Sequence, residues 1–280
     1  MNELRLDGII AELTKRHGID LEELQGESLV QINVNEYNNS VGNLNERDGY
    51  NCPTCKNRGY IAFVNDNNLE SRSPCKCQKV RDVLSRANKS GLGEILSEKT
   101  FDKYEVTDSW QKDAKERCIK FCKDEKANWL YFGGQVGSGK THLCSAICGH
   151  YIKQGRDTLY MMWEDESKKL KALVTDYSAY QSLINRYKDV EVLYIDDLFK
   201  TQQGEAPTKA DINLAFEIIN NRLFSPDKIT IISSEKTLNE LLDYDEATMS
   251  RICEKTGNYK INIGKDIKKN YRLRNSGVTI

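Results

Sequence analysis

The sequence predicts an α/β protein with a parallel sheet, and three observations carry this prediction. Apolar, strand-like stretches alternate with helical stretches from residue 128 to residue 263, as in chains of β-α units. A glycine-rich turn, GGQVGSGKTH, lies between an apolar strand and a helix. A second apolar strand, VEVLYIDD, ends in two carboxylates, at the sheet edge where ligands gather.

The chain of 280 residues is long enough for two domains, or for one large domain with an appendage. We expect a small N-terminal helical and zinc-binding domain at residues 1–95 and a nucleotide-binding domain at residues 96–280. Apolar residues at helical spacing predict helices in residues 1–26. The polar, Asn-rich residues 33–48 predict a linker or loop.

The composition restricts where the protein works and what it binds. Lys and Arg (41) balance Asp and Glu (42), so any nucleic-acid surface must be local. No stretch is apolar for long enough to span a membrane, and the N-terminus lacks the apolar core of a signal peptide. Nine cysteines without such a signal indicate a reducing compartment, so we expect a cytoplasmic protein.

Four of the cysteines occur as two close pairs. Cys52 and Cys55 form C-P-x-C, Cys75 and Cys77 form C-x-C, and the 19 residues between the pairs leave room for a hairpin with a strand at 60–64. Four thiolates suit a closed, tetrahedral Zn²⁺ site, with an iron–sulfur cluster as the alternative. We expect zinc to supply much of the folding energy of this small module.

Residues 134–141 match the phosphate-binding loop G-x-x-x-x-G-K-[ST] at every fixed position. Its glycines let backbone N–H groups converge on phosphate, and the next helix directs its N-terminal dipole there. Lys140 supplies a point charge for the β- and γ-phosphates, and the Thr141 hydroxyl is a ligand for Mg²⁺. The predicted cofactor-binding residues of this loop are Gly134, Gln135, Val136, Gly137, Ser138, Gly139, Lys140, Thr141 and His142.

The segments that follow the loop supply the remaining polar groups. Asp196 is expected to hold Mg²⁺, and Asp197 to polarise an attacking water. The next strand, residues 228–234, ends in polar side chains, and the helix over 238–255 carries Arg251.

Together these features resemble the AAA+ ATPases of the bacterial DnaC/DnaI type, the loaders of the replicative helicase, including phage-encoded versions. The resemblance covers nearly the whole chain, and its most specific parts are CPTC…CKC, GGQVGSGKTH, LYIDDL, IISS and NYRLR. It implies an AAA+ P-loop core and an ATPase that uses ATP and Mg²⁺ slowly unless a partner or single-stranded DNA stimulates it. It also implies binding to a DnaB-type helicase hexamer and to single-stranded DNA, and a homo-oligomer in the ATP-bound state.

Carried over by residue, the resemblance makes Asp196 and Asp197 the Walker B pair, Arg251 an arginine finger and Arg272 a second sensor. One departure affects the first sensor, because Glu235 stands where the family usually has Asn after the Ser/Thr pair. A carboxylate beside the γ-phosphate is electrostatically unfavourable. We therefore expect either that Ser234 takes the sensor role or that hydrolysis is slow.

Two other functions stay open at this point. Transposition-helper ATPases share the AAA+ core, although a four-cysteine module is not part of their usual pattern. A zinc-based adaptor with a vestigial nucleotide site would bind the helicase with little hydrolysis. The sequence leaves open the host, the particular helicase, the oligomer size, and whether the basic stretch around Tyr271 contacts DNA.

Overall fold

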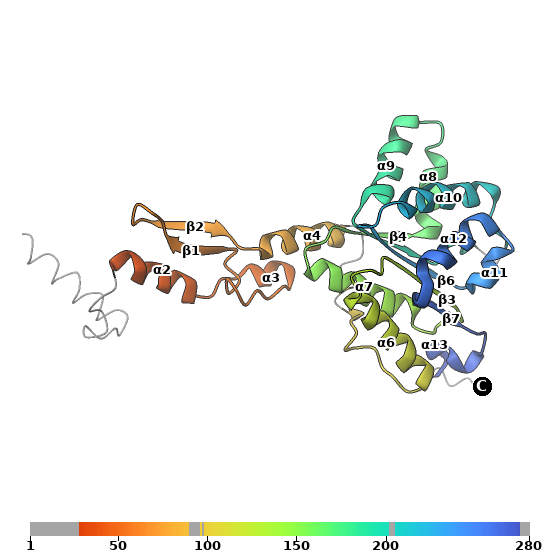
Figure 1. Ribbon diagram of the computed structural model, residues 1–280, viewed down its shortest axis with the longest axis horizontal. Helices are drawn as coiled ribbons and strands as arrows, with labels where there is room; N and C mark the ends of the chain where they lie inside the picture. Colours follow the sequence, from red (N-terminus) through yellow and green to blue (C-terminus); the bar gives the residue numbers. More distant parts are fainter. Residues whose placement is uncertain (1–27, 90–95, 97, 202–204, 275–280) are drawn as a thin grey trace, which may run out of the picture. The chain divides into compact units, whose positions relative to one another are not determined.

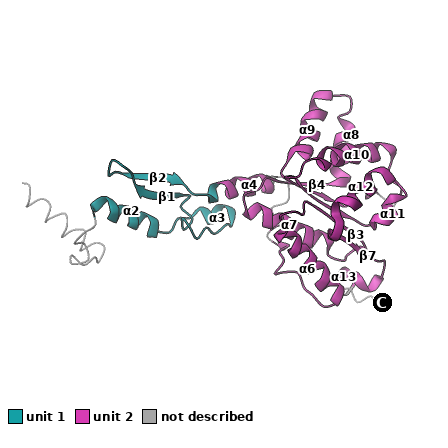
Figure 2. Ribbon diagram, in the orientation of Figure 1, with its two compact units in different colours: residues 1–78 teal, residues 79–280 magenta. Residues whose placement is uncertain are grey.

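Two units make up the chain in the computed structural model, Met1–Gln78 and Lys79–Ile280 (Figure 2). The structure describes residues 28–89, 96, 98–201 and 205–274. The helices expected in residues 1–26 lie outside these ranges.

The first unit contains the four paired cysteines, a hairpin and two helices. Helix α2 (Leu29–Asn39) begins after Ser28, whose hydroxyl accepts from the Gln31 N–H, and α3 spans Leu44–Asp48. The antiparallel hairpin joins β1 (Tyr60–Val64) to β2 (Glu70–Pro74), which confirms the strand predicted at 60–64.

The linker predicted over residues 33–48 is wrong, because α2 and α3 occupy most of it. The Asn38 side chain accepts from the Ala62 N–H and donates to the Ala62 carbonyl, both at 2.9 Å. An asparagine that counts against a helix in sequence statistics therefore fixes α2 to the hairpin. Tertiary hydrogen bonding outweighs the local propensity here.

The second unit contains a five-stranded parallel sheet, which confirms the predicted fold class (Figure 1). Every residue of β3, β5 and β6 is buried, as expected for central strands covered on both faces. The strand order is β4 (Thr158–Met162), β5 (Val192–Asp196), β6 (Ile229–Ser234), β3 (Trp129–Gly134) and β7 (Lys260–Ile263).

Helices cover both faces of this sheet, and alternate strand residues join two separate cores (Figure 1). Leu130 and Phe132 of β3 pack with α4 (Cys77–Lys89), α6 (Ser109–Lys123) and α7 (Lys140–Lys153). Trp129 and Tyr131 face the other layer. That layer comprises α8 (Trp163–Ala172), α9 (Tyr177–Asp189), α10 (Lys209–Leu223), α11 (Leu238–Leu242) and α12 (Glu246–Thr256). A short helix, α13 (Tyr271–Arg274), follows β7.

Arg222, near the end of α10, is fully buried. It lies at the amino ends of the central strands, whereas the glycine-rich loop lies at their carboxyl ends. Its guanidinium donates to groups at the end of α9, just before β5, and at the start of β6. The acceptors are the carbonyls of Tyr187 (3.0 Å), Lys188 (3.2 Å), Val190 (2.8 Å) and Ile229 (2.7 Å), and the Thr230 hydroxyl (2.9 Å). One side chain thus joins a helix end to two neighbouring strands.

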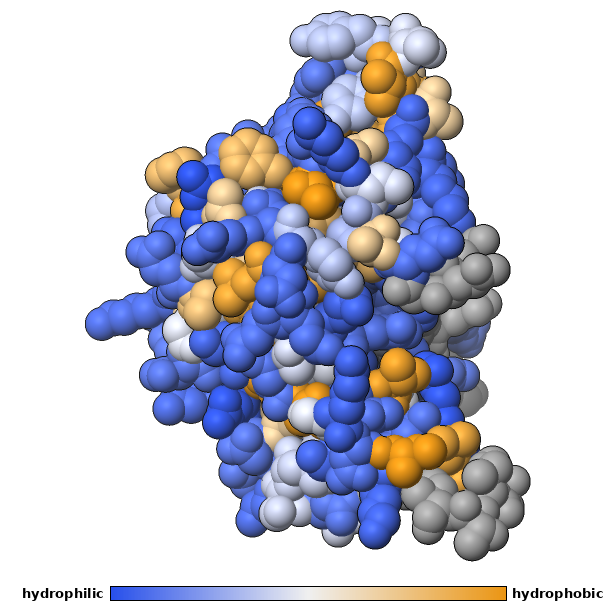
Figure 3. Space-filling model, turned by 90° about the vertical axis from the view of Figure 1, so that its right-hand side faces the viewer, coloured by the Kyte–Doolittle hydropathy of each residue, from blue (hydrophilic) through white to orange (hydrophobic). Residues whose placement is uncertain are grey.

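The face shown in Figure 3 is mostly hydrophilic, and its described hydrophobic side chains form small, separate groups. Exposed apolar residues of this unit include Val174, Tyr177 and Phe224. Among the helices that the structure describes, none is long and apolar enough to cross a membrane.

Candidate nucleotide site and cysteine cluster

The carboxyl ends of the central strands open onto a cavity of about 340 Å³. The loop after β3 forms its floor, and residues 99–105, the end of β5 and α13 contribute walls. Lys140, Thr141, His142, Asp197 and Arg272 all line it, so one hollow collects most of the predicted nucleotide residues.

The glycine-rich loop needs glycine at two positions. At each one the backbone φ is positive, and a side chain would collide with neighbouring atoms. Gly134 has φ +105°, and a Cβ there would lie 1.9 Å from the Ile263 carbonyl oxygen. Gly137 has φ +71°, and a Cβ there would meet the Asn270 side chain. Helix α7 begins at Lys140 with no side-chain cap, so its first N–H groups face the cavity as an anion site.

Lys140 is folded back onto this loop, with only 6% of the residue exposed. Its ammonium donates to the carbonyls of Gly134 (2.9 Å) and Gln135 (2.8 Å). Burial lowers the pKa of Lys140, and the nearby Asp197 and Glu235 carboxylates oppose that shift. The Lys140 ammonium is therefore held on the loop, close to the Asp197 and Glu235 carboxylates.

Both carboxylate oxygens of Asp196 accept hydrogen bonds from hydroxyl groups. Its Oδ1 accepts from Thr141 (3.2 Å), Tyr194 (2.6 Å) and Ser233, and its Oδ2 accepts from Tyr160 (2.7 Å). Oxygen ligands of this kind are what Mg²⁺ prefers. The structure thus brings together the two predicted magnesium ligands, Thr141 and Asp196, and orients the second of them.

Asp197 lies in the turn after β5 with a left-handed φ of +55°. Its N–H donates to the Ser233 hydroxyl (3.0 Å), and its carboxylate accepts from Lys200 (2.8 Å). Lys200 also pairs with Glu235 at 2.9 Å. Burial and the neighbouring Asp196 charge raise the pKa of Asp197, and Lys200 partly offsets them.

The two serines at the end of β6 have different hydrogen-bond partners. The Ser233 hydroxyl reaches both aspartates, whereas the Ser234 hydroxyl donates to the Leu198 carbonyl (2.9 Å). Ser233 is thus a residue that sequence reasoning missed, and so are Tyr160, Tyr194 and Lys200. The only available signal for Lys200 was its position three residues after Asp197 in DDLFK.

The far end of the cavity is lined by aromatic and basic side chains. Tyr104 packs edge-on against His142, with ring centroids 5.2 Å apart, and the His142 ring bonds to the Thr100 carbonyl (2.8 Å). Burial lowers the pKa of His142. Tyr271 donates to the Glu105 carboxylate at 2.6 Å across this end of the cavity.

Arg251 lies apart from these residues, on the exposed side of α12. Its guanidinium donates to the Asn220 side chain (3.2 Å) and stands 5.7 Å from the Phe216 ring centroid. It does not line the cavity of its own chain, which separates it from the other predicted site residues.

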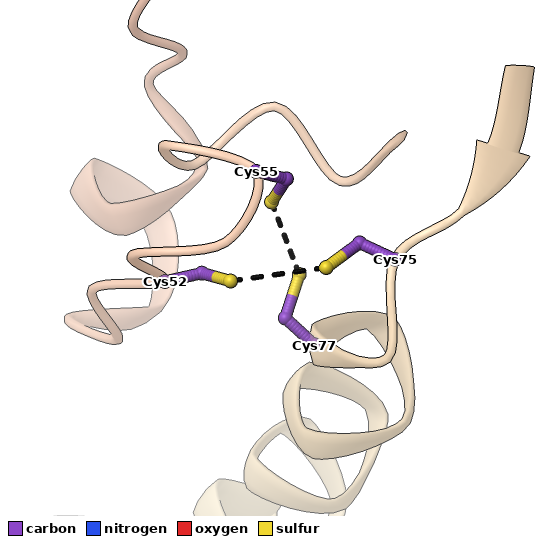
Figure 4. Close-up of side chains that lie close together, drawn as sticks. All are labelled: Cys52, Cys55, Cys75 and Cys77. Atoms are coloured by element: carbon purple, nitrogen blue, oxygen red, sulfur yellow. Dashed lines mark hydrogen bonds between the residues drawn. The ribbon is translucent and has the colours of Figure 1, made fainter. Parts of the chain in front are cut away.

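The four paired cysteines of the first unit converge on one point (Figure 4). All are buried, and their sulfurs lie within 4.8 Å of one another. Two of the distances are 3.8 Å, between Cys52 and Cys75, and 3.5 Å, between Cys55 and Cys77. Tetrahedral zinc with Zn–S bonds of about 2.3 Å separates its sulfurs by about 3.8 Å, so the cluster has the size that Zn²⁺ requires.

The backbone of the first cysteine pair supports thiolates. Gly59, at φ +81°, donates its N–H to the Cys55 sulfur (3.2 Å), and the Cys52 N–H is held by the Asn57 side chain (2.8 Å). Burial disfavours the Cys52 thiolate, but backbone hydrogen bonds from Cys55 and Thr54 and the neighbouring thiols lower its pKa to about 7.

Comparison with known proteins matches the chain to one family model and to several relatives. The family model of the bacterial DnaA ATPase domain matches residues 97–256, more than half of the chain. The uncharacterized protein YqaM of Bacillus subtilis (strain 168) is 31% identical over 210 residues, 71% of this chain and 66% of YqaM. The phage-like element PBSX protein XkdC of the same strain is 31% identical over 236 residues, 80% of this chain and 86% of XkdC.

Among solved structures, the crystal structure of DnaI matches with a TM-score of 0.50 and 23% identity, over 61% of this chain and 92% of DnaI. This is a likeness in fold, and it confirms the predicted AAA+ P-loop core. The predicted resemblance to AAA+ proteins of the DnaC/DnaI type, with phage-element relatives, is confirmed as well. The chain spans just under two thirds of YqaM and most of XkdC.

Proposed function

Since the chain belongs to the bacterial DnaA ATPase domain family, we propose that it loads the replicative DNA helicase onto single-stranded DNA during replication initiation, at the expense of ATP. One observation carries the proposal. The Thr141 hydroxyl, at the start of α7, lines the same cavity as Lys140 and lies 3.2 Å from the Asp196 carboxylate, at the end of β5. Such a group suits a nucleoside triphosphate with its metal ion.

The residues of the cavity divide the work of hydrolysis. The loop N–H groups and Lys140 bind the phosphates, and Thr141 and Asp196 hold Mg²⁺, which offsets the phosphate charge when bound. Asp197 orients and polarises the water that attacks the γ-phosphorus, which releases ADP and phosphate. Basal turnover is slow in this proposal, since the Asp197 carboxylate is engaged by Lys200.

The cysteine cluster holds one Zn²⁺ in this proposal. Four buried thiols at zinc-compatible spacing support a structural site with no open coordination position. None of the nine cysteines forms a disulfide, which suits a reducing compartment such as the cytoplasm. We assign helicase binding to the N-terminal domain predicted as residues 1–95, and ATP and single-stranded DNA binding to residues 96–280.

Two surface features support the assembly and the DNA partner. Arg251 is separated from the cavity of its own chain, as an arginine finger that completes a neighbouring subunit's site must be. The sequence around the exposed Tyr271 is rich in basic residues, and such a combination suits the backbone and bases of single-stranded DNA. We therefore propose a homo-oligomer in the ATP-bound state.

The test is capture of a DnaB-type helicase hexamer by the full chain in ATP and in ADP. We expect capture that depends on the nucleotide, and loss of capture with Cys75→Ser while ATP affinity stays within about twofold. Lys140→Ala should abolish ATP binding with the fold intact, because it removes a charge directed at phosphate. Unchanged ATP affinity in Lys140→Ala would refute the nucleotide site.

ATP turnover with and without single-stranded DNA separates the loader from its alternatives. A loader should hydrolyse ATP faster with DNA or helicase present. Helicase capture without any turnover would identify an adaptor instead, and DNA-stimulated turnover without helicase capture would refute the loader assignment.

A further inference from the structure

Lys200 bridges two carboxylates at the wall of the nucleotide cavity. We infer that it is a positioning residue, which neutralises Glu235 and Asp197 so that the site accepts the γ-phosphate and distinguishes ATP from ADP. The inference rests on the proposed function, because it takes the cavity to hold ATP.

The bridge connects two strand ends. Lys200 follows β5, three residues after Asp197, while Glu235 follows β6 directly. The Lys200 ammonium lies 2.8 Å from the Asp197 carboxylate and 2.9 Å from the Glu235 carboxylate. All three residues line the cavity that also holds Lys140.

The position of Lys200 offsets an excess of negative charge in this site. Asp197 and Glu235 line one wall of the cavity, the Asp196 charge lies close enough to raise the pKa of Asp197, and a γ-phosphate beside them adds further negative charge. These groups are partly buried, with side-chain exposures of 24% for Asp197 and 35% for Glu235, so water screens their repulsion incompletely. A cation is needed at this wall in addition to Lys140.

Lys200 can supply that cation without leaving the carboxylates. An ammonium group has three N–H donors, and the two carboxylates use two of them, so one is available for a phosphate oxygen. The two flanking carboxylates raise the pKa of Lys200 against the opposing effect of burial, so the charge is present at neutral pH. ADP lacks the phosphate that would occupy this place, and its binding should depend little on Lys200.

The test compares the dissociation constants of ATP and ADP, both with Mg²⁺, by calorimetry on the full chain. Lys200→Ala should weaken ATP binding by about 10- to 100-fold, the range expected for a hydrogen bond between charged groups, and ADP binding by less than about threefold. Lys200→Arg should retain most of the preference for ATP. The matched control is Lys168→Ala, an exposed lysine paired with Glu164 on α8, which should change neither constant.

A rescue experiment separates charge balance from a merely structural role. Glu235→Gln in the Lys200→Ala background should recover part of the lost ATP affinity, because it removes one of the two carboxylates left without their cation. Glu235→Gln alone should tighten ATP relative to ADP, and this variant tests the inference even if Lys200→Ala does not fold.

Equal weakening of ATP and ADP by Lys200→Ala, or the absence of rescue, would overturn the role of Lys200. An unchanged ATP preference in both Lys200→Ala and Glu235→Gln would overturn it too. These results leave the proposed function intact, because that function is tested separately by helicase capture, by ATP turnover and by the loss of ATP binding in Lys140→Ala.

Discussion

Arg222→Met should destabilise the second unit by about 3–5 kcal/mol, because it leaves several buried acceptors without this donor, at about 1–3 kcal/mol for each one left unsatisfied, while it removes the desolvation cost of the guanidinium. Methionine fills similar space but donates no hydrogen bond. The five acceptors, at 2.7–3.2 Å, would lose this donor inside the protein. A bond to a charged donor contributes about 1.5–3 kcal/mol before the desolvation of the guanidinium is subtracted, so the net loss is well below the sum of five.

The assay is urea unfolding followed by tryptophan fluorescence. All three tryptophans, Trp110, Trp129 and Trp163, belong to the unit that contains Arg222, so the signal reports on its unfolding. Trp129 and Trp163 are almost completely buried, which favours a large change in emission. The dependence of the unfolding free energy on urea should keep its slope, while the midpoint falls.

Two further variants make this prediction specific. Arg222→Lys keeps the charge but has three donors for five acceptors, so we expect a loss of about 2 kcal/mol. Arg117→Met, on the exposed face of α6 where it pairs with Asp113, should cost less than about 1 kcal/mol. If Arg222→Met costs no more than Arg117→Met, the guanidinium network does not stabilise the fold, and the reasoning is wrong.

Four other perturbations address the site and the cysteine unit. Asp197→Asn should keep ATP bound and lower single-turnover hydrolysis by about two orders of magnitude; normal turnover would exclude Asp197 as the group that polarises water. Mixing Arg251→Ala with Lys140→Ala protein should give more ATPase activity than either variant alone, and no gain at any ratio would contradict a role in trans. Chelation should remove roughly one zinc per chain, measured by atomic absorption, and unfold the cysteine unit; a metal-free unit with an unchanged circular dichroism spectrum would refute the structural role. A hydrogen bond from Lys265 lowers the pKa of Glu240 from 4.5 to about 2, so its stabilisation is present above pH 4.5 and lost as the pH falls toward 2. The stability difference between the unaltered protein and Glu240→Gln should shrink over that window, and a constant difference would contradict it.

The elements with a strong local signal could be predicted from the sequence. The buried strands read as continuous apolar runs, and the glycine-rich turn between strand and helix gave the position of the cavity. The cysteine pairs were predicted to meet because a short hairpin returns the chain to its start, and their sulfurs do meet. Each of these features depends on residues close together in sequence.

Features that depend on pairing between distant segments could not be predicted. Arg222 ends a helix with a polar surface, and only the neighbourhood of α9, β5 and β6 supplies its acceptors. Successive strand residues point to opposite sides, so the sequence ISSE does not tell which serine faces Asp196. Ser233 does, because β6 lies beside β5 in one particular register.

The turn after β5 has a mechanical consequence. Asp197 and Phe199 have left-handed φ angles of +55° and +60°, which orients the Leu198 N–H toward the Ser233 carbonyl (2.8 Å) and the Leu198 carbonyl toward the Ser234 hydroxyl (2.9 Å). Two hydrogen bonds outside the strand ladder thereby join the ends of β5 and β6. A shift of either strand end alone would break these bonds, so we expect the response to the γ-phosphate in the side chains that extend from the two ends and in the segments on the other side of the cavity.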